Sequence, residues 1–251
     1  MTLRPARRGL VPPFIAMDVM RAANALEAAG ERVIHLEVGQ PGTPAPAAVL
    51  AAARAALDNE RIGYTDAGGI PKLREAIAAH YRAQYGIAVD PAEVFVTTGS
   101  SAAFQLAFLA AFEPGDRVAL AAPGYPAYRN ILLALGLETV LIEARENAHY
   151  QPNPELLDEF PDLAGLIVAS PANPTGTMIA PAELHRLCDY CRGRGIRLVS
   201  DEIYHGITYE AAAQSARAFE PVDQKSGAIV INSFSKYYSM TGWRLGWMLA
   251  P

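Results

Sequence analysis

The chain has 251 residues, of which 51% are hydrophobic and 19% charged, and its formal net charge is −5 at pH 7. These values predict a globular protein with one sizeable core and exclude a disordered one. The acidic balance, with no dense Lys/Arg run, argues against nucleic acid as a partner. No apolar run is long enough to span a bilayer, and no secretory h-region follows the basic residues Arg4, Arg7 and Arg8. We therefore expect a cytoplasmic protein without a membrane anchor.

Short apolar runs rich in β-formers alternate with longer amphipathic stretches. The predicted elements, in chain order, are helices over 14–29, 46–57 and 72–85, a strand over 94–97, a helix over 101–112, a strand over 117–121, a helix over 125–135, a strand over 139–142, a helix over 154–159, a strand over 165–169, a helix over 181–194, and strands over 197–200, 228–231 and 244–249. This alternation is typical of βαβ units. It predicts an α/β three-layer sandwich, in which helices cover both faces of a mostly parallel seven-stranded sheet.

Polar residues gather directly after several of the predicted strands. They lie in the segments 99–101, 123–125, 170–176, 201–204 and 233–236. In open α/β sheets, ligands bind beyond the carboxyl ends of the strands, where the connecting loops converge. The sequence therefore predicts that these segments form one functional site.

Lys236 follows the very apolar strand over 228–231 and should lie at the edge of the core. Burial lowers the pKa of a lysine and frees its amine for imine chemistry. Taken alone, the same lysine is better explained by a side chain that extends from a helix start into water. Its neighbours decide between the two interpretations.

Several groups near Lys236 are suited to a phosphate. Ser233 and Ser235 precede the lysine, Arg244 follows it, and a helix is predicted to start at Ser100 and Ser101. Hydroxyls, a guanidinium and the free N–H groups of a helix N-terminus all bind a doubly charged anion. Each residue could equally be a helix cap or part of a surface pair, so only their convergence indicates a site.

Asp201 directly follows the strand over 197–200, and a buried carboxylate needs a cationic partner. A protonated pyridine nitrogen would be such a partner, whereas the simpler alternative is a helix N-cap. Tyr204 and Asn173 could contact the same ring, and Tyr125 could stack on it.

The only two cysteines, Cys188 and Cys191, lie three residues apart with His185 just before them. No second pair of ligands completes a zinc site, and the segment is predicted to be mid-helix. We expect ordinary half-buried thiols and no metal.

Three segments carry a combined motif: 170–176 (Ser-Pro-Ala-Asn-Pro-Thr-Gly), 200–204 (Ser-Asp-Glu-Ile-Tyr) and 233–246 (from Ser-Phe-Ser-Lys to Arg-Leu-Gly). Together they resemble the class I aminotransferases among the fold-type I pyridoxal-phosphate enzymes. They occur in the family's order and at its spacing. The resemblance extends to Gly63–Gly68 and to Val38–Pro41, and so covers almost the whole chain.

The resemblance implies a role for each matching position. Lys236 matches the lysine that forms a Schiff base with pyridoxal 5′-phosphate, and Asp201 matches the partner of the pyridine nitrogen. Asn173 and Tyr204 match the pair that hydrogen-bonds the phenolic oxygen of the cofactor. The positions that match other cofactor contacts are Ser100, Ser101, Tyr125, Ser233, Ser235 and Arg244, together with Tyr64, which would reach the phosphate of a neighbouring subunit. Gly39 matches a backbone contact near the substrate carboxylate, and the Asn173–Pro174 bond is expected to be cis.

These roles imply an enzyme that moves an amino group from an L-amino acid to a 2-oxo acid and works as a homodimer. They also imply an N-terminal segment over 1–45, shared between the small domain and dimer contacts, and a large cofactor-binding domain over 46–251. The family's C-terminal small domain, which supplies the arginine for the substrate's α-carboxylate, is expected to be absent from this chain. Arg244 cannot replace that arginine, because its position matches the phosphate ligand.

Two alternatives stay open at this point. The first is other chemistry on the same cofactor and fold, such as a carbon–sulfur lyase or a decarboxylase. The second is a truncated cofactor-binding fragment with little turnover. The sequence does not specify which amino acid is the donor.

Overall fold

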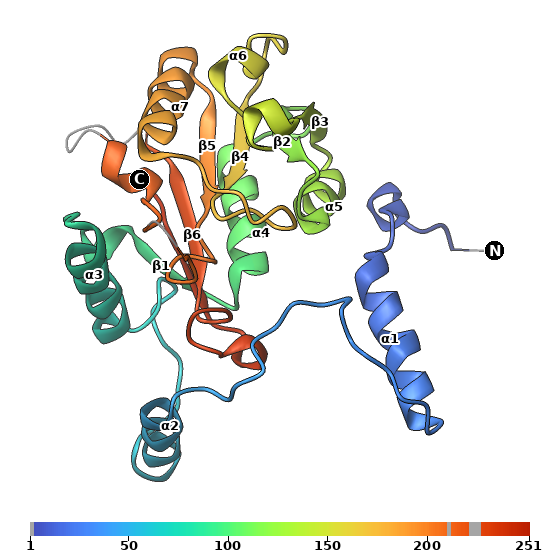
Figure 1. Cartoon of the computed structure of the whole chain (residues 1–251). Coiled ribbons are helices and arrows are strands. Elements are labelled where there is room, and N and C mark those ends of the chain that lie inside the picture. The colour runs from blue at the N-terminus through green and yellow to red at the C-terminus, as the bar shows by residue number, and fades with distance from the viewer. Residues whose placement is uncertain (1–2, 210–211, 221–226) are drawn as a thin grey trace.

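The computed structural model of the chain describes residues 3–209, 212–220 and 227–251 (Figure 1). Its centre is a seven-stranded sheet in the order β1-β7-β6-β5-β4-β2-β3. The strands are β1 Val94–Thr97, β2 Arg117–Ala122, β3 Glu138–Glu143, β4 Gly165–Ala169, β5 Arg197–Asp201, β6 Ile229–Ser233 and β7 Gly246–Leu249. All pairings are parallel except those of β7, which runs antiparallel to both β1 and β6. The predicted α/β sandwich with a mostly parallel sheet is therefore confirmed.

Helices lie between most of the strands, as the sequence predicts. They are α1 Ile15–Ala28, α2 Ala47–Asn59, α3 Pro71–Tyr85, α4 Ser100–Ala111, α5 Pro126–Leu135, α6 Pro154–Leu157 and α7 Pro181–Arg194. The helices α3, α5, α6 and α7 each begin with proline. Proline suits a first helical position, because the N–H that it lacks would have no intrahelical partner there.

Two apolar clusters fill the space on the two faces of the sheet. On one face α3 and α7 contribute Tyr81 and Leu187 against Val230 of β6. On the other face α4 and α5 contribute Phe108 and Leu132 against Ile229 and Ile231 of the same strand. Adjacent strand residues thus enter opposite clusters, as the pleat of a strand requires, and both faces are covered.

Two local expectations need correction, and one alternative is excluded. The excluded alternative is a helix N-cap at Asp201, because this residue is the last of β5 and no helix starts there. The last strand begins at Gly246 instead of residue 244, because Arg244 has a φ of 51° in the left-handed region. Cys188 and Cys191 are not half-buried: both are 2% exposed, because the face of α7 that carries them packs into the core.

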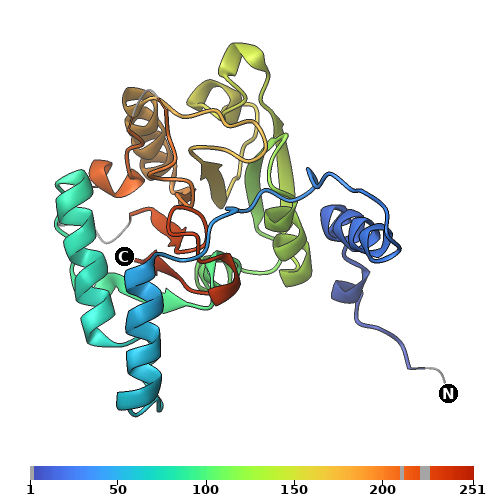
Figure 2. The same cartoon turned by 60° about the horizontal axis from the view of Figure 1, so that its bottom comes forward.

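The N-terminal part of the chain is arranged differently from the rest. In Figures 1 and 2, α1 and α2 project from separate places on the sheet-containing body and are joined by an extended segment. Only Ala23 of α1 is buried, and no residue of α2 is. A domain boundary near residue 45 remains a prediction. Among the described residues, no helix is both long and apolar enough to cross a bilayer.

Candidate active site

A cavity of about 360 Å³ opens at the carboxyl ends of the central strands. Its walls come from the start of α1, the extended segment before α2, the N-termini of α4 and α5, and the ends of β4, β5 and β6. It brings together predicted site residues from six separate parts of the chain, namely Gly39, Ser100, Tyr125, Asn173, Asp201, Tyr204 and Lys236. The expectation that polar strand ends converge is met for these residues.

Lys236 follows β6 and extends its amine into this cavity. The Nζ atom donates a hydrogen bond to the carbonyl oxygen of Gly39, with 2.7 Å between the two atoms. It also lies 5.8 Å from the centre of the Tyr204 ring. Burial lowers the pKa of Lys236, and the positive charge of Arg244 lowers it further. The amine is thus easier to deprotonate than that of a lysine in water.

Asp201 lies at the bottom of the cavity and is only 5% exposed. One carboxylate oxygen accepts a hydrogen bond from the backbone N–H of Ile203 at 3.0 Å, and the other accepts from the hydroxyl of Tyr128. Burial raises the pKa of Asp201 to about 6 in spite of these donors. The carboxyl group therefore lacks a cationic partner among the described residues that would stabilise its charge.

Tyr128 is a site residue that the sequence reasoning missed. It is buried in α5, one helical turn after Tyr125, and the two rings pack edge to face with 5.3 Å between their centres. Residues three apart on a helix share a face, so a tyrosine at this spacing from a predicted stacking residue was a usable signal.

Aromatic and amide groups surround the middle of the cavity. Tyr125 packs edge to face against Phe14, at 5.7 Å between ring centres, and both rings line the cavity. Burial and the charge of Asp201 raise the pKa of Tyr204. Asn173 stands on the loop after β4, and its bond to Pro174 is cis, as expected.

A cradle for an anion lies beside this cavity, at the N-terminus of α4. Gly99 precedes the helix with a φ of 87°, and no side chain caps the first N–H groups. A Cβ atom at Gly99 would collide with the guanidinium of Arg244, so only glycine lets the arginine approach the helix end. The Nη1 atom of Arg244 donates to the hydroxyl oxygen of Ser235 at 3.5 Å. A positive side chain and free N–H groups thus meet at one point.

The other predicted site residues lie elsewhere. Ser101 is exposed and lines a neighbouring cleft between α4 and α5. Ser233 lines a second cavity, on the far side of β6, and its hydroxyl accepts a hydrogen bond from the N–H of Ser235 at 3.1 Å. Tyr64 is fully exposed and contacts no part of the site within this chain.

The arrangement has a clear chemical capability. An amine with a lowered pKa can condense with a carbonyl compound, and a buried carboxylate can stabilise a cation beside it. The aromatic ring of Tyr125 and the anion cradle can orient a flat, phosphorylated ring between them.

Comparisons with known proteins agree with this geometry. Residues 31–251 match the family model described as aminotransferase class I and II. The chain is 52% identical to a valine–pyruvate aminotransferase from Mycobacterium tuberculosis, over 100% of the chain and 64% of the relative. It is 34% identical to an aspartate aminotransferase from Geobacillus stearothermophilus, over 95% of the chain and 61% of the relative.

Solved structures give the same result. An aminotransferase from Mycobacterium tuberculosis superimposes with a TM-score of 0.93 at 52% identity, over 100% of this chain and 64% of that one. The aspartate aminotransferase from Thermus thermophilus with maleate gives 0.93 at 32% identity, over 100% and 65%. The chain spans less than two thirds of the length of these relatives. On the family match and on these similarities, the chain belongs to the class I and II aminotransferase family.

Proposed function

We propose that the chain binds pyridoxal 5′-phosphate through Lys236 and transfers an amino group from an L-amino acid to a 2-oxo acid. The observation that carries the proposal is the meeting of Lys236, Asp201, Asn173 and Tyr204 in one cavity, although they come from the ends of three different strands. The family of the chain favours transamination over the other reactions that the same cofactor supports.

Asp201 fits the ring nitrogen of this cofactor. Its carboxyl group is buried, is held by two hydrogen bonds, and forms no ion pair with any described residue. A protonated ring nitrogen would supply the missing positive charge and would lower the pKa of Asp201 again. With that charge in place, the cofactor when bound serves as an electron sink for negative charge at the substrate's Cα.

The cradle at α4 fits the phosphate group. Arg244, the hydroxyls of Ser100 and Ser235, and the first N–H groups of α4 would donate to it. Arg244 already points at the helix end, so its side chain loses little freedom on binding.

Lys236 is the residue that would take and return the proton. Burial and Arg244 lower its pKa, so a larger fraction of the amine is unprotonated near neutral pH than in an exposed lysine. This unprotonated form can accept a proton at Nζ. The carbonyl oxygen of Gly39 accepts from Nζ and so fixes the direction of the amine. Phe14, Met17 and Val38 form an apolar wall of the same cavity.

We also propose that the donor has an apolar side chain. Apart from Lys236, no lysine or arginine lines the described cavity, whereas Glu37 does, and its carboxylate lies 2.7 Å from Nδ1 of His35. A second carboxylate on the donor would be repelled by the charge of Glu37. The relative named as a valine–pyruvate aminotransferase supports an apolar donor.

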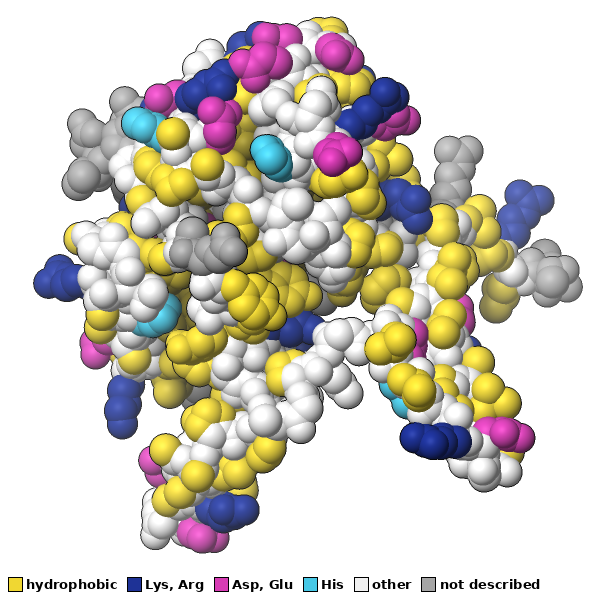
Figure 3. Space-filling model, in the orientation of Figure 1, with side chains coloured by type: hydrophobic (Ala, Val, Ile, Leu, Met, Phe, Trp, Pro, Cys, Tyr) yellow, Lys and Arg dark blue, Asp and Glu magenta, His cyan; other side chains and the backbone are white. Residues whose placement is uncertain are grey.

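A homodimer is part of the proposal. Large hydrophobic side chains are exposed on the projecting N-terminal part, including Ile15 at 68%, Leu36 at 89% and Tyr64 at 110% exposure. Figure 3 shows such side chains along both projecting helices. Apolar surface of this extent is usually covered by another chain. A cytoplasmic location agrees with the two free, buried thiols.

Binding is tested by absorbance and by borohydride reduction. The chain mixed with pyridoxal 5′-phosphate should turn yellow, and mass spectrometry after reduction should place the cofactor on Lys236. Lys236→Ala should abolish the adduct, whereas Lys72→Ala on the surface of α3 should leave it unchanged. A colourless wild-type chain, or an adduct on another lysine, would contradict the proposal.

The donor is tested in single turnovers of the yellow protein. Valine should convert the cofactor to its aminated, colourless form at least about tenfold faster than aspartate does. Glu37→Gln should reduce that preference, because it removes the repelling charge. Equal rates for valine and aspartate would contradict the apolar pocket, and no conversion by any amino acid would favour a fragment without turnover.

A further inference from the structure

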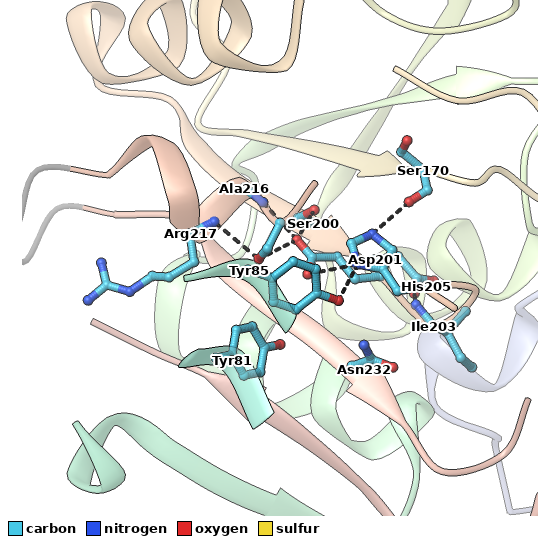
Figure 4. A network of polar contacts seen from close by, with 12 residues as sticks. Tyr81, Tyr85, Ser170, Ser200, Asp201, Ile203, His205, Ala216, Arg217 and Asn232 are labelled. Carbon is cyan, nitrogen blue, oxygen red and sulfur yellow. Dashed lines mark hydrogen bonds and ion pairs between the residues drawn. The ribbon is translucent and has the colours of Figure 1, made fainter. Parts of the chain in front are cut away.

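A buried polar network lies behind the proposed cofactor site, on the α3 side of the sheet (Figure 4). At its centre is His205, which is 7% exposed and does not line the cofactor cavity. The network joins three elements that are far apart in the sequence: α3, the end of β5, and the loop after β4. No contact of His205 is needed for the chemistry proposed above, so the role of its side chain must lie in the segments that it connects.

The two ring nitrogens of His205 have different partners. Nε2 lies 2.9 Å from the carbonyl oxygen of Ser170, and Nδ1 lies 2.8 Å from the hydroxyl of Tyr85. A carbonyl oxygen can only accept, so Nε2 carries the proton and donates it to Ser170. Nδ1 then accepts from the Tyr85 hydroxyl. Burial lowers the pKa of His205 to about 4, which keeps this neutral form at physiological pH.

Glu202 holds the other end of the network. Its Oε1 atom accepts from the hydroxyls of Ser200 and Ser215, at 3.1 and 3.0 Å, and from the N–H of Ala216 at 2.8 Å. Its Oε2 atom has no hydrogen-bond partner in the described part of the chain and lies 3.6 Å from Nδ1 of His205. The carboxyl group therefore stands against one side of the imidazole and limits where the ring can turn.

The bond to Ser170 matters because this residue begins the loop that carries Asn173 into the cofactor cavity. His205 itself directly follows Tyr204, which enters the same cavity. The start of the loop is also held from its other side, because the hydroxyl oxygen of Ser170 accepts a hydrogen bond from the N–H of Ile179 at 2.9 Å. The His205 contact is thus a direct link between the two loops that supply Asn173 and Tyr204.

We propose that His205 is a positioning residue, which fixes Asn173 relative to Tyr204 by donating a hydrogen bond from Nε2 to the carbonyl oxygen of Ser170. The inference rests on the proposed function, because Asn173 and Tyr204 are the residues expected to donate to the phenolic oxygen of the cofactor. With the cofactor bound, those two donors would stabilise the form of the Lys236 adduct that has lost its proton. The pH at which the adduct loses its proton and changes colour therefore reports their positions.

Two polar substitutions separate the contacts of His205. His205→Gln places an amide N–H near the position of Nε2 and keeps a donor for Ser170, but gives up the contact with Tyr85. His205→Asn places its amide oxygen near the position of Nδ1 and keeps an acceptor for Tyr85, but cannot reach Ser170. Both side chains are polar and smaller than or similar to histidine, so both variants should fold. Ser215→Ala is the control for damage to the network at the Glu202 end.

The chain with bound pyridoxal 5′-phosphate is titrated between pH 5 and 9 while absorbance and thermal stability are recorded. His205→Asn should raise the pH midpoint of the colour change by about half a unit or more, the effect of weakening one hydrogen bond. His205→Gln and Ser215→Ala should keep the wild-type midpoint, although both should lower the melting temperature.

Two results would overturn the inference. If the Asn and Gln variants share one midpoint, whether shifted or not, the Ser170 bond does not position Asn173 and His205 only stabilises the fold. If Ser215→Ala shifts the midpoint as much as His205→Asn, general damage to the network is responsible. Failure of the proposed function looks different, because the wild-type chain would then give no yellow adduct to titrate.

Discussion

Removing the charge of Asp201 should make the cofactor-free chain gain stability relative to wild type as the pH rises from about 4 to about 7. The carboxyl group is 5% exposed, and burial raises its pKa from 3.8 to about 6. A carboxyl group with a raised pKa binds its proton more tightly in the folded state than in the unfolded state. Its ionisation therefore costs stability, and the cost appears as pH rises from the unfolded pKa to the folded one.

The size of the effect comes from these two pKa values. Well below the unfolded pKa of 3.8 the group is protonated in both states and costs nothing. Above about pH 6 the cost is constant at about 3 kcal/mol, since each pKa unit corresponds to about 1.4 kcal/mol. Asp201→Asn should thus gain about 2 kcal/mol of stability relative to wild type between about pH 4 and pH 7. Any effect of the amide that does not depend on pH cancels in this comparison.

Urea unfolding of the cofactor-free proteins at the two pH values measures the difference. Asp66→Asn is the matched control, because it removes the charge of an exposed aspartate with no side-chain hydrogen bond among the described residues. With pyridoxal 5′-phosphate present, wild type should instead be the more stable of the two proteins at neutral pH, because only the aspartate can pair with a protonated ring nitrogen. A stability difference that stays constant between the two pH values would refute the idea that burial of this charge is costly.

Two further predictions concern packing. Gly206→Ala should destabilise the chain by about 1–3 kcal/mol, because the residue has a φ of 84° and a Cβ atom would collide with the ring of Tyr237; thermal unfolding should show the loss. Gly193 in α7 has ordinary helical geometry and open space around the position of a Cβ atom, so Gly193→Ala should be neutral or stabilising by up to about 1 kcal/mol. Equal losses of stability in both variants would contradict the steric explanation. Cys188 and Cys191, whose pKa values burial raises to about 12, should resist a thiol reagent at about pH 8 until urea unfolds the chain, and fast labelling of the native protein would show that α7 opens locally.

The sequence predicted the strands well because their apolar runs are short and end sharply. The predicted strands over 94–97 and 165–169 agree with β1 and β4 in both bounds. Both strands lie in a sheet that helices cover on its two faces, so their composition alone separates them from the amphipathic helices. Lys236 and Asp201 were considered as site residues because each comes at or soon after the end of such a run, and the residues around Lys236 then favoured a site.

Side-chain direction and depth were harder to predict. Ser101 follows Ser100 in the chain, yet one lines the cofactor cavity and the other an outer cleft, because adjacent helical residues point about 100° apart. The burial of Cys188 and Cys191 depends on which face of α7 packs on the sheet. His205 gave no signal at all, because its partners Tyr85 and Ser170 are distant in the sequence and meet it only in the folded chain.

The direction of β7 also has a topological consequence. Because β7 is antiparallel to β6, it starts at the edge of the sheet where β6 ends. The residue two positions before it, Arg244, is thereby delivered to the same edge as Lys236 and beside Gly99, which comes shortly after β1. Had β7 run parallel to its neighbours, the guanidinium would stand at the opposite rim, about 13 Å away for a strand of this length. The antiparallel direction of this one strand therefore decides whether Arg244 and Lys236 lie at the same edge of the sheet, where both can contact one ligand, or at opposite edges.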